Sequence, residues 1–255
     1  MKNLPKEYLN TLKAKGDCVS VIIDCKADNE ILSKLNNLGI AVFKSVSLDF
    51  LYSPVNTHPD MQIHFVDKTT AVVAPSAYDY YKTVLPGNIN LIKGASDPGS
   101  TYPGDCAYNV ARLGNKIIGN LSYLDTKIIE IYKEQGKAFV NAKQGYTKCN
   151  LCIVDENSVI TEDEGLSLKL KSLGVEVLKI SAGGVVLKNF PYGFIGGSSG
   201  LLNDKKLLFC GDLNLHPDSE DIKKFVNQRK VDIICLSSTK LSDIGSILYF
   251  DDSFK

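Results

Sequence analysis

The strongest constraint on this chain is a short pattern of secondary structure that returns along most of its length. Two strands joined by a tight turn are predicted at 62–66 and 70–74, then a short helix that stops at Pro86-Gly87, then a strand at 88–92. The same order returns in three further units, whose second strands are centred on Ile117, Ile160 and Leu208. The alternative is an ordinary α/β sheet with hairpins. In such sheets strands and helices usually alternate strictly, whereas here a hairpin precedes every helix, which favours the repeat.

A fifth unit is predicted to be split between the two ends of the sequence. Residues 246–250 supply its first strand, and residues 19–23, 29–38 and 40–45 supply the second strand, the helix and the third strand. Pairing of 246–250 with 19–23 would close a ring and remove its free edges, as in propellers. The pattern therefore predicts an α/β fold, a five-bladed α/β propeller of ββαβ units, with residues 1–255 forming a single domain.

Composition limits the classes of partner. Lysine plus arginine and aspartate plus glutamate number 29 each, which argues against a nucleic-acid or anionic-membrane surface. Residues 1–15 lack the apolar core of a signal peptide, no apolar run has membrane-spanning length, and the seven cysteines are scattered. These features predict a cytoplasmic protein with reduced thiols. The oligomeric state is not indicated.

Polar residues mark the point where each first strand begins. Asp60, Asp105 and Lys148 occupy equivalent places in three units, and strand alternation adds further inward positions. These are Gln62, Ala107 and Asn150, followed by His64, Asn109 and Cys152. We expect them to converge on a pocket at the ring axis, unless the centre is only a water-filled, hydrogen-bonded region.

The types of residue suggest roles within this pocket. Asp60 and Asp105 can hold a planar cation such as guanidinium, and His58 at the rim can move protons. The glycine-rich run Gly193–Gly200 lacks the lysine of a P-loop, so Gly197, Ser198 and Ser199 are predicted to line one wall through close backbone approach. Neither Cys149-x-x-Cys152 nor the set His58, Asp60 and His64 has a specific ligand spacing, so no metal or cofactor is expected.

Several short motifs resemble one superfamily. These are His-Pro-Asp at 58–60, Tyr-Pro-Gly-Asp-Cys-Ala-Tyr-Asn at 102–109, Tyr-Gly-Phe-Ile-Gly-Gly-Ser-Ser-Gly at 192–200, and Cys-Gly-Asp-Leu-Asn-Leu-His-Pro-Asp at 210–218. Together with the five units, they resemble the pentein, or guanidine-group-modifying enzyme, fold, and more narrowly an uncharacterised bacterial family of that superfamily.

The resemblance implies a mechanism in which a cysteine attacks the guanidino carbon, a histidine assists and acidic residues hold the cation. His58 and Asp60 match the His-x-Asp pair, and Asp105 matches a further acidic position. The nucleophile is expected in a late glycine-rich loop, where this chain has Ser198 and Ser199 and no cysteine. Cys152, with Lys148 nearby, and Cys106 are alternative nucleophiles; Ser198 or Ser199 acting with His58 is a third.

Three functions follow as hypotheses. The first is a hydrolase or amidinotransferase acting on a guanidine- or amidine-type small molecule. The second is a non-catalytic pentein that binds a small polar or cationic metabolite. The third is a pentein that binds a macromolecular partner on one face, like the ribosomal anti-association factor of this fold, and the neutral charge weakens it. Fast alkylation of one thiol at pH 6–7 would separate the first from the second.

Overall fold

The computed structural model describes residues 19–203 and 205–252. Residues 1–15 and one of the seven cysteines, Cys18, lie outside this range. The described chain forms five three-stranded sheets, each built from an antiparallel pair followed by a parallel strand. The fold is therefore mixed α/β, as predicted.

Four sheets consist of consecutive strands. Their strands, in chain order, are β3 (Ile63–Phe65), β4 (Thr70–Val73) and β5 (Asn90–Lys93); β6 (Ala111–Leu113), β7 (Lys116–Gly119) and β8 (Ala138–Asn141); β9 (Cys152–Ile153), β10 (Ser158–Thr161) and β11 (Glu176–Lys179); and β12 (Ser199–Leu202), β13 (Lys206–Phe209) and β14 (Asp232–Cys235).

The remaining sheet joins distant parts of the sequence. β15 (Leu248–Asp251) pairs antiparallel with β1 (Val19–Ile23), which pairs in parallel with β2 (Ala41–Lys44). The pairing expected between the first and last strands is thus confirmed, with Val21 opposite Tyr249. All five residues of β1 are buried, because this strand lies in the middle of its sheet.

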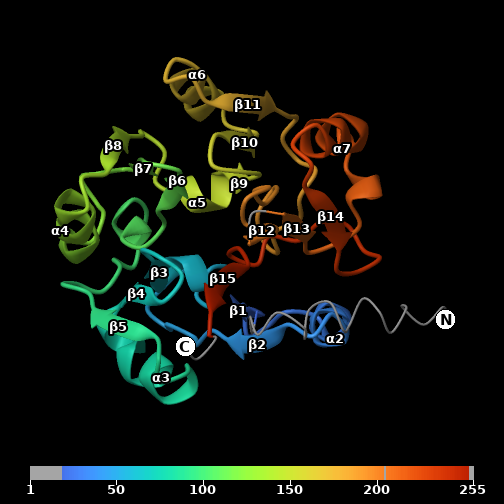
Figure 1. The fold of residues 1–255 in the computed structure, drawn as a ribbon. Helices are drawn as coiled ribbons and strands as arrows, with labels where there is room; N and C mark the ends of the chain where they lie inside the picture. Colours follow the sequence, from blue (N-terminus) through green and yellow to red (C-terminus); the bar gives the residue numbers. More distant parts are fainter. Residues whose placement is uncertain (1–18, 204, 253–255) are drawn as a thin grey trace.

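The helices connect the second and third strand of each sheet, and they lie on the outside (Figure 1). They are α2 (Asn29–Asn37), α3 (Tyr78–Val84), α4 (Thr126–Glu134), α6 (Glu164–Lys171) and α7 (Ser219–Asn227). The first strands β3, β6, β9, β12 and β15 lie towards the common centre in the same view. No helix within the described residues has the length and apolar character needed to span a membrane.

Two boundaries differ from the predictions for identifiable reasons. The sequence pattern predicts a helix from about Tyr123 to Glu134, but the helix begins at Thr126, because the Asp125 carboxylate caps it by accepting from the Lys127 backbone N–H. The same pattern predicts the first strand of the fourth unit at 193–195, but that strand is Ser199–Leu202. The segment before it folds against the chain next to α5 (Thr147–Asn150), where Gly197 N donates to Cys149 O at 2.8 Å.

Candidate functional site

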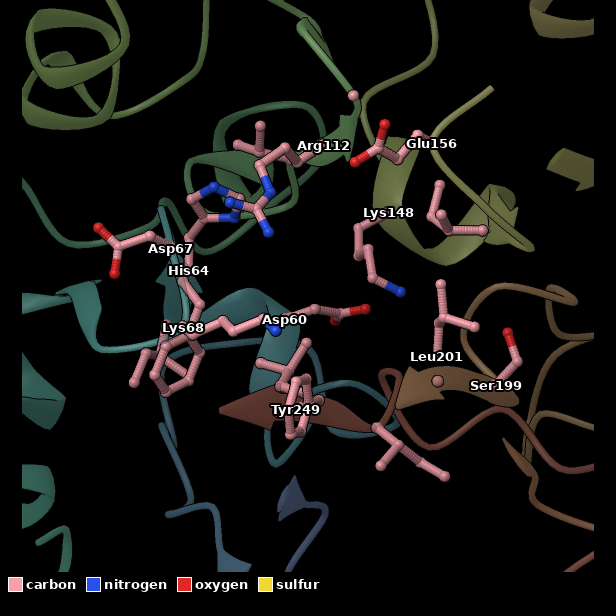
Figure 2. Close-up of a pocket in the computed structure, with 18 of the residues that line it drawn as sticks. Asp60, His64, Asp67, Lys68, Arg112, Lys148, Glu156, Ser199, Leu201 and Tyr249 are labelled. Atoms are coloured by element: carbon pink, nitrogen blue, oxygen red, sulfur yellow. The ribbon is translucent and has the colours of Figure 1, made fainter. Parts of the chain in front are cut away.

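The site is a cavity of about 420 Å³ between the first strands of the sheets. Buried and half-buried side chains of Asp60, His64, Lys148 and Ser199 line its inner part, and residues of the hairpin turns line its outer part. Figure 2 shows the Lys148 side chain extending towards Asp60 across this space. We call the region around Asp60, Lys148 and Ser246 the floor of the cavity.

Asp60 is the most enclosed charge of the floor, with 1% of its surface exposed. It lies on the short 3-10 helix η1 (Pro59–Met61), which Pro59 initiates at its first position. The Asp60 Oδ2 atom accepts hydrogen bonds from Ser246 Oγ at 2.7 Å and from Cys149 Sγ at 3.0 Å. The Asp60 Oδ1 atom is buried and has no hydrogen-bond partner within the described chain. One oxygen of this carboxylate therefore has two donors, and the other has none within the described chain.

Lys148 reaches the floor from the one-turn helix α5 (Thr147–Asn150). The Asn109 Oδ1 atom accepts from the Lys148 N–H at 2.8 Å and from the Cys149 N–H at 3.3 Å, which holds the start of this helix in place. The Lys148 ammonium donates to Ser246 Oγ at 3.0 Å. Ser246 therefore lies between the ammonium and the Asp60 carboxylate and hydrogen-bonds to both.

The Cys149 thiol forms the underside of the floor. Asn109 Nδ2 donates to Cys149 Sγ at 3.1 Å, and the thiol in turn donates to Asp60 Oδ2. Burial raises the pKa of Cys149 well above its ordinary value, and the negative charges of Asp60 and Asp243 act in the same direction. The thiol is thus held in its protonated form as a donor to Asp60.

His64 forms one wall and is neutral. The His64 Nε2 atom is 2.7 Å from the Tyr132 hydroxyl, and the ring is 7% exposed. Burial, together with the positive charges of Arg112 and Lys148, lowers the pKa of His64 to about 3. His64 therefore contributes hydrogen bonding and shape, without charge, at physiological pH.

Charged side chains surround the mouth of the cavity (Figure 2). Arg112 is fixed by a 2.8 Å hydrogen bond from Nη1 to Val66 O, and the Lys68 ammonium lies 5.9 Å from the centre of the Tyr249 ring. Asp67 and Asp155 each accept backbone N–H groups of their own hairpin turn, and Glu156 follows in the second of these turns. The mouth is thus polar and carries both signs of charge.

The structure brings together part of the predicted set. Asp60, His64, Lys148 and Ser199 line the cavity, whereas the other predicted residues are not among its lining residues. Those are His58, Gln62, Asp105, Cys106, Asn109, Cys152, Gly197 and Ser198.

Strand alternation does not describe the segments on which these residues lie. Asp60, Asp105 and Lys148 belong to one-turn helical segments, η1, η3 (Gly104–Cys106) and α5. A helical turn rotates successive side chains by much less than the half-turn of a strand. Gln62 consequently donates to Val46 O and His58 O and accepts from Tyr81 Oη, on the side away from the cavity.

Asp105 occupies a separate polar cluster. Its carboxylate accepts from the Tyr146 hydroxyl at 2.6 Å and from Cys106 Sγ at 3.3 Å. Burial raises the pKa of Cys106, and the adjacent Asp105 charge raises it further. The two predicted cation-binding carboxylates therefore do not share one space.

His58 lies beneath the loop that carries Ser246. Its ring nitrogens are 3.9 Å from Asp24 Oδ2 and 3.9 Å from Asp243 Oδ1. The ring is 2% exposed and faces Gly245, where a Cβ would collide with His58. The His58 ring therefore packs against Gly245 and Asp243 of the loop that carries Ser246.

Cys152 is buried in the core rather than presented to the cavity. Burial raises its pKa and outweighs the lowering produced by the Ser199 hydrogen bond and by the Lys148 charge, so that the pKa is about 12. The predicted influence of Lys148 on this thiol exists, but it is the smaller effect.

The glycine-rich segment supports the floor through its backbone. Gly196 O accepts from Ser246 Oγ at 3.1 Å, and Gly197 O accepts from Ser246 N at 2.8 Å. Both serine hydroxyls of this segment donate to backbone carbonyls: Ser198 Oγ donates to Ile195 O at 2.9 Å, and Ser199 Oγ donates to Gly196 O at 3.3 Å.

Ser246 and Cys149 are floor residues that the sequence reasoning missed. Ser246 has φ of 72°, a conformation uncommon for residues other than glycine, asparagine and aspartate. Nothing in the local sequence distinguishes this serine from the serines of other turns. The structural signal is that its hydroxyl joins two ionic groups that are far apart in the sequence.

Comparisons with known proteins relate the chain to one family and to several solved structures. The model of a family of unknown function, DUF6873, matches residues 22–248. No curated protein matches the chain. Among solved structures, an adduct of dimethylarginine dimethylaminohydrolase is similar, with a TM-score of 0.53 and 9% identity over 86% of this chain and 92% of that one.

Two further solved structures are similar over most of their length. A cysteine-to-serine variant of agmatine deiminase from C. jejuni, with substrate bound, has a TM-score of 0.53 and 10% identity over 94% of each chain. The inosamine-phosphate amidinotransferase of Streptomyces griseus has a TM-score of 0.52 and 11% identity over 88% of this chain and 90% of that one. The chain therefore belongs to the DUF6873 family, and its fold is that of the pentein superfamily.

Proposed function

We propose that this protein is a single-domain, five-bladed pentein whose central cavity binds a small polar molecule through a planar carbon–nitrogen group of the guanidino, amidino or ureido type. Asp60 is the principal acceptor in this proposal. The observation that carries it is the Asp60 carboxylate, which lines the cavity and whose buried Oδ1 atom has no partner in the described chain. Burying a carboxylate oxygen without a hydrogen-bond donor costs free energy on the order of a few kcal/mol, and an N–H donor from a ligand removes that cost.

The similar structures support this ligand class. Their names refer to dimethylarginine, to agmatine and to amidino transfer. At this level of identity the likeness concerns the fold, and the ligand class of this chain is inferred from the groups of its own floor. A cytoplasmic location is part of the proposal and rests on the scattered cysteines.

Replacing Asp60 by Asn tests the role of this carboxylate. The amide removes the negative charge and presents N–H groups where an acceptor is required. We expect the affinity for the best ligand among methylguanidine, acetamidine and methylurea to fall by about 10- to 100-fold. Titration of ¹⁵N-labelled protein, followed by the chemical shifts of the floor residues, measures affinities in this weak range.

Asp105→Asn is the matched control. It makes the same chemical change in a buried aspartate that bonds to Tyr146 and Cys106 and does not line the cavity. Binding by Asp105→Asn should equal that of the native protein. Equal binding by native protein and Asp60→Asn would contradict the proposal.

Catalysis by a thiol is the second candidate. The observation in its favour is the position of Cys149, whose sulfur touches the Asp60 carboxylate. Against it, burial raises the pKa of Cys106, Cys149 and Cys152, so none of the three is expected to be a thiolate near neutral pH.

Alkylation separates binding from thiol catalysis. Because the pKa of Cys152 is raised to about 12, its thiolate fraction at pH 7 is lower than that of a free cysteine by more than about a thousandfold. We expect the three thiols to resist iodoacetamide in the native protein and to react after unfolding in guanidinium chloride, as measured by peptide mass spectrometry. Rapid labelling of one of them at pH 6–7 would instead favour the catalytic candidate.

A further inference from the structure

The charges of the floor limit which planar carbon–nitrogen group it accepts. The Asp60 carboxylate and the Lys148 ammonium are both hydrogen-bonded to Ser246 Oγ, so the floor already holds one negative and one positive charge. A cationic ligand adds a second positive charge beside Lys148, which the single carboxylate does not neutralise.

A second cation lies near the same wall. The positive charges of Arg112 and Lys148 both act on His64. Within the described residues, neither cation forms an ion pair. Three acidic residues line the outer part of the cavity. Asp67 and Asp155 direct a carboxylate oxygen at the backbone of their own turns, and Glu156 lies near Arg112 and Lys148 in Figure 2 without an ion pair to either within the described residues.

The hydrogen-bonding capacity of the floor is of two kinds. Asp60 Oδ1 accepts only, and it has no partner in the described chain. The Lys148 ammonium donates only, and Ser246 Oγ takes one of its three N–H groups. A group that matches both must carry an N–H donor and a carbonyl acceptor on one planar carbon.

We propose that the cavity selects a neutral ureido or primary carboxamide group over a guanidinium, with its N–H on Asp60 Oδ1 and its C=O on Lys148 Nζ. This inference rests on the proposed function, because it specifies the ligand of the same site. A guanidinium offers donors only, so it gives no acceptor to the two remaining N–H groups of the Lys148 ammonium and places two cations side by side. Lys148 is thereby the residue that sets the specificity of the site.

The experiment compares methylurea with methylguanidine, which have the same shape and differ in charge and in one acceptor. Both are titrated into ¹⁵N-labelled full-length protein at pH 7. We expect methylurea to bind about tenfold more tightly than methylguanidine to the native protein. In Lys148→Met, which keeps an apolar stem and removes the ammonium, the order should reverse, because the Asp60 charge is then unopposed.

Lys148→Arg is the charge-matched control, and it should keep the preference for methylurea. If Lys148→Met does not fold, the comparison of the two probes on the native protein still tests the inference. Tighter binding of methylguanidine to the native protein would overturn the inference and leave the proposed function standing. If folded Lys148→Met has the same ratio of methylurea affinity to methylguanidine affinity as the native protein, the inference is also overturned and the proposed function stands. If neither methylurea nor methylguanidine changes the chemical shifts of the protein, both the inference and the proposed function are overturned.

Discussion

Ending the chain at Gly245 is expected to unfold the whole protein rather than to fray one end. The truncation removes β15. Within the described sheets β1 pairs with β15 on one side and with β2 on the other, so β1 loses one of its two partners. It also removes Phe250, which is fully buried and stacks on Phe65 with ring centres 5.2 Å apart. Loss of one buried Phe side chain alone costs about 3–5 kcal/mol, compared with a total stability of about 5–15 kcal/mol for a typical domain. Circular dichroism and urea unfolding measure the result.

Two point variants show how much of the effect of the truncation comes from the Phe250 side chain alone. Phe250→Ala keeps the β15 backbone and should cost about 3–5 kcal/mol of unfolding free energy. Phe190→Ala removes the same side chain from a position that is 41% exposed, and its cost should be well under half of that. A truncated protein with native-like cooperative unfolding would show that β15 is dispensable, contrary to the closing role assigned to it.

Gly196→Ala is expected to damage both stability and binding. A Cβ at this position would lie 2.6 Å from Cys149 O and 2.6 Å from the Leu151 carbonyl carbon, which are backbone atoms that cannot rotate away. Relief requires displacement of the segment around α5, and this segment carries Lys148. We expect a loss of about 1–3 kcal/mol or more of unfolding free energy. Weaker binding of methylurea should accompany it, because Gly196 O also accepts from Ser246 Oγ.

Gly87→Ala is the matched glycine control. A Cβ at Gly87 meets nothing within 4 Å, and Gly87 does not have a positive φ. Its stability should be unchanged, or higher by up to about 1 kcal/mol because the unfolded chain loses freedom. Equal stabilities for Gly196→Ala and Gly87→Ala would mean that the close approach of Gly196 to α5 is not tight.

The sequence predicted the order of elements well because that order depends on local signals. Hairpin turns, helix stops and short apolar strands leave marks within a few neighbouring residues, as at Pro86-Gly87 and at the turn Gly114-Asn115. The pairing of the terminal strands followed from the same pattern, because an incomplete unit at each end leaves strands that need partners.

The site was predicted only in part, and the difference has a geometric cause. Asp60, His64 and Lys148 were identified as polar residues at the starts of first strands, and these three line the cavity. Asp105 met the same criterion but turns towards Tyr146, because η3 places it on a different side of the chain. Whether a polar residue precedes a strand is a local property, whereas the direction of its side chain depends on the turn that the backbone makes there.

What the sequence by itself determined is therefore the repeated ββαβ order and the residues from which a polar centre could be built. What only the tertiary structure decided is the hydrogen-bonded arrangement of the floor. Ser246 lies between Lys148 and Asp60, and Cys149 donates to the same carboxylate oxygen, although these residues belong to distant parts of the chain. Hydrogen bonds require positions accurate to a few tenths of an ångström, and only the packing of the five sheets supplies that accuracy.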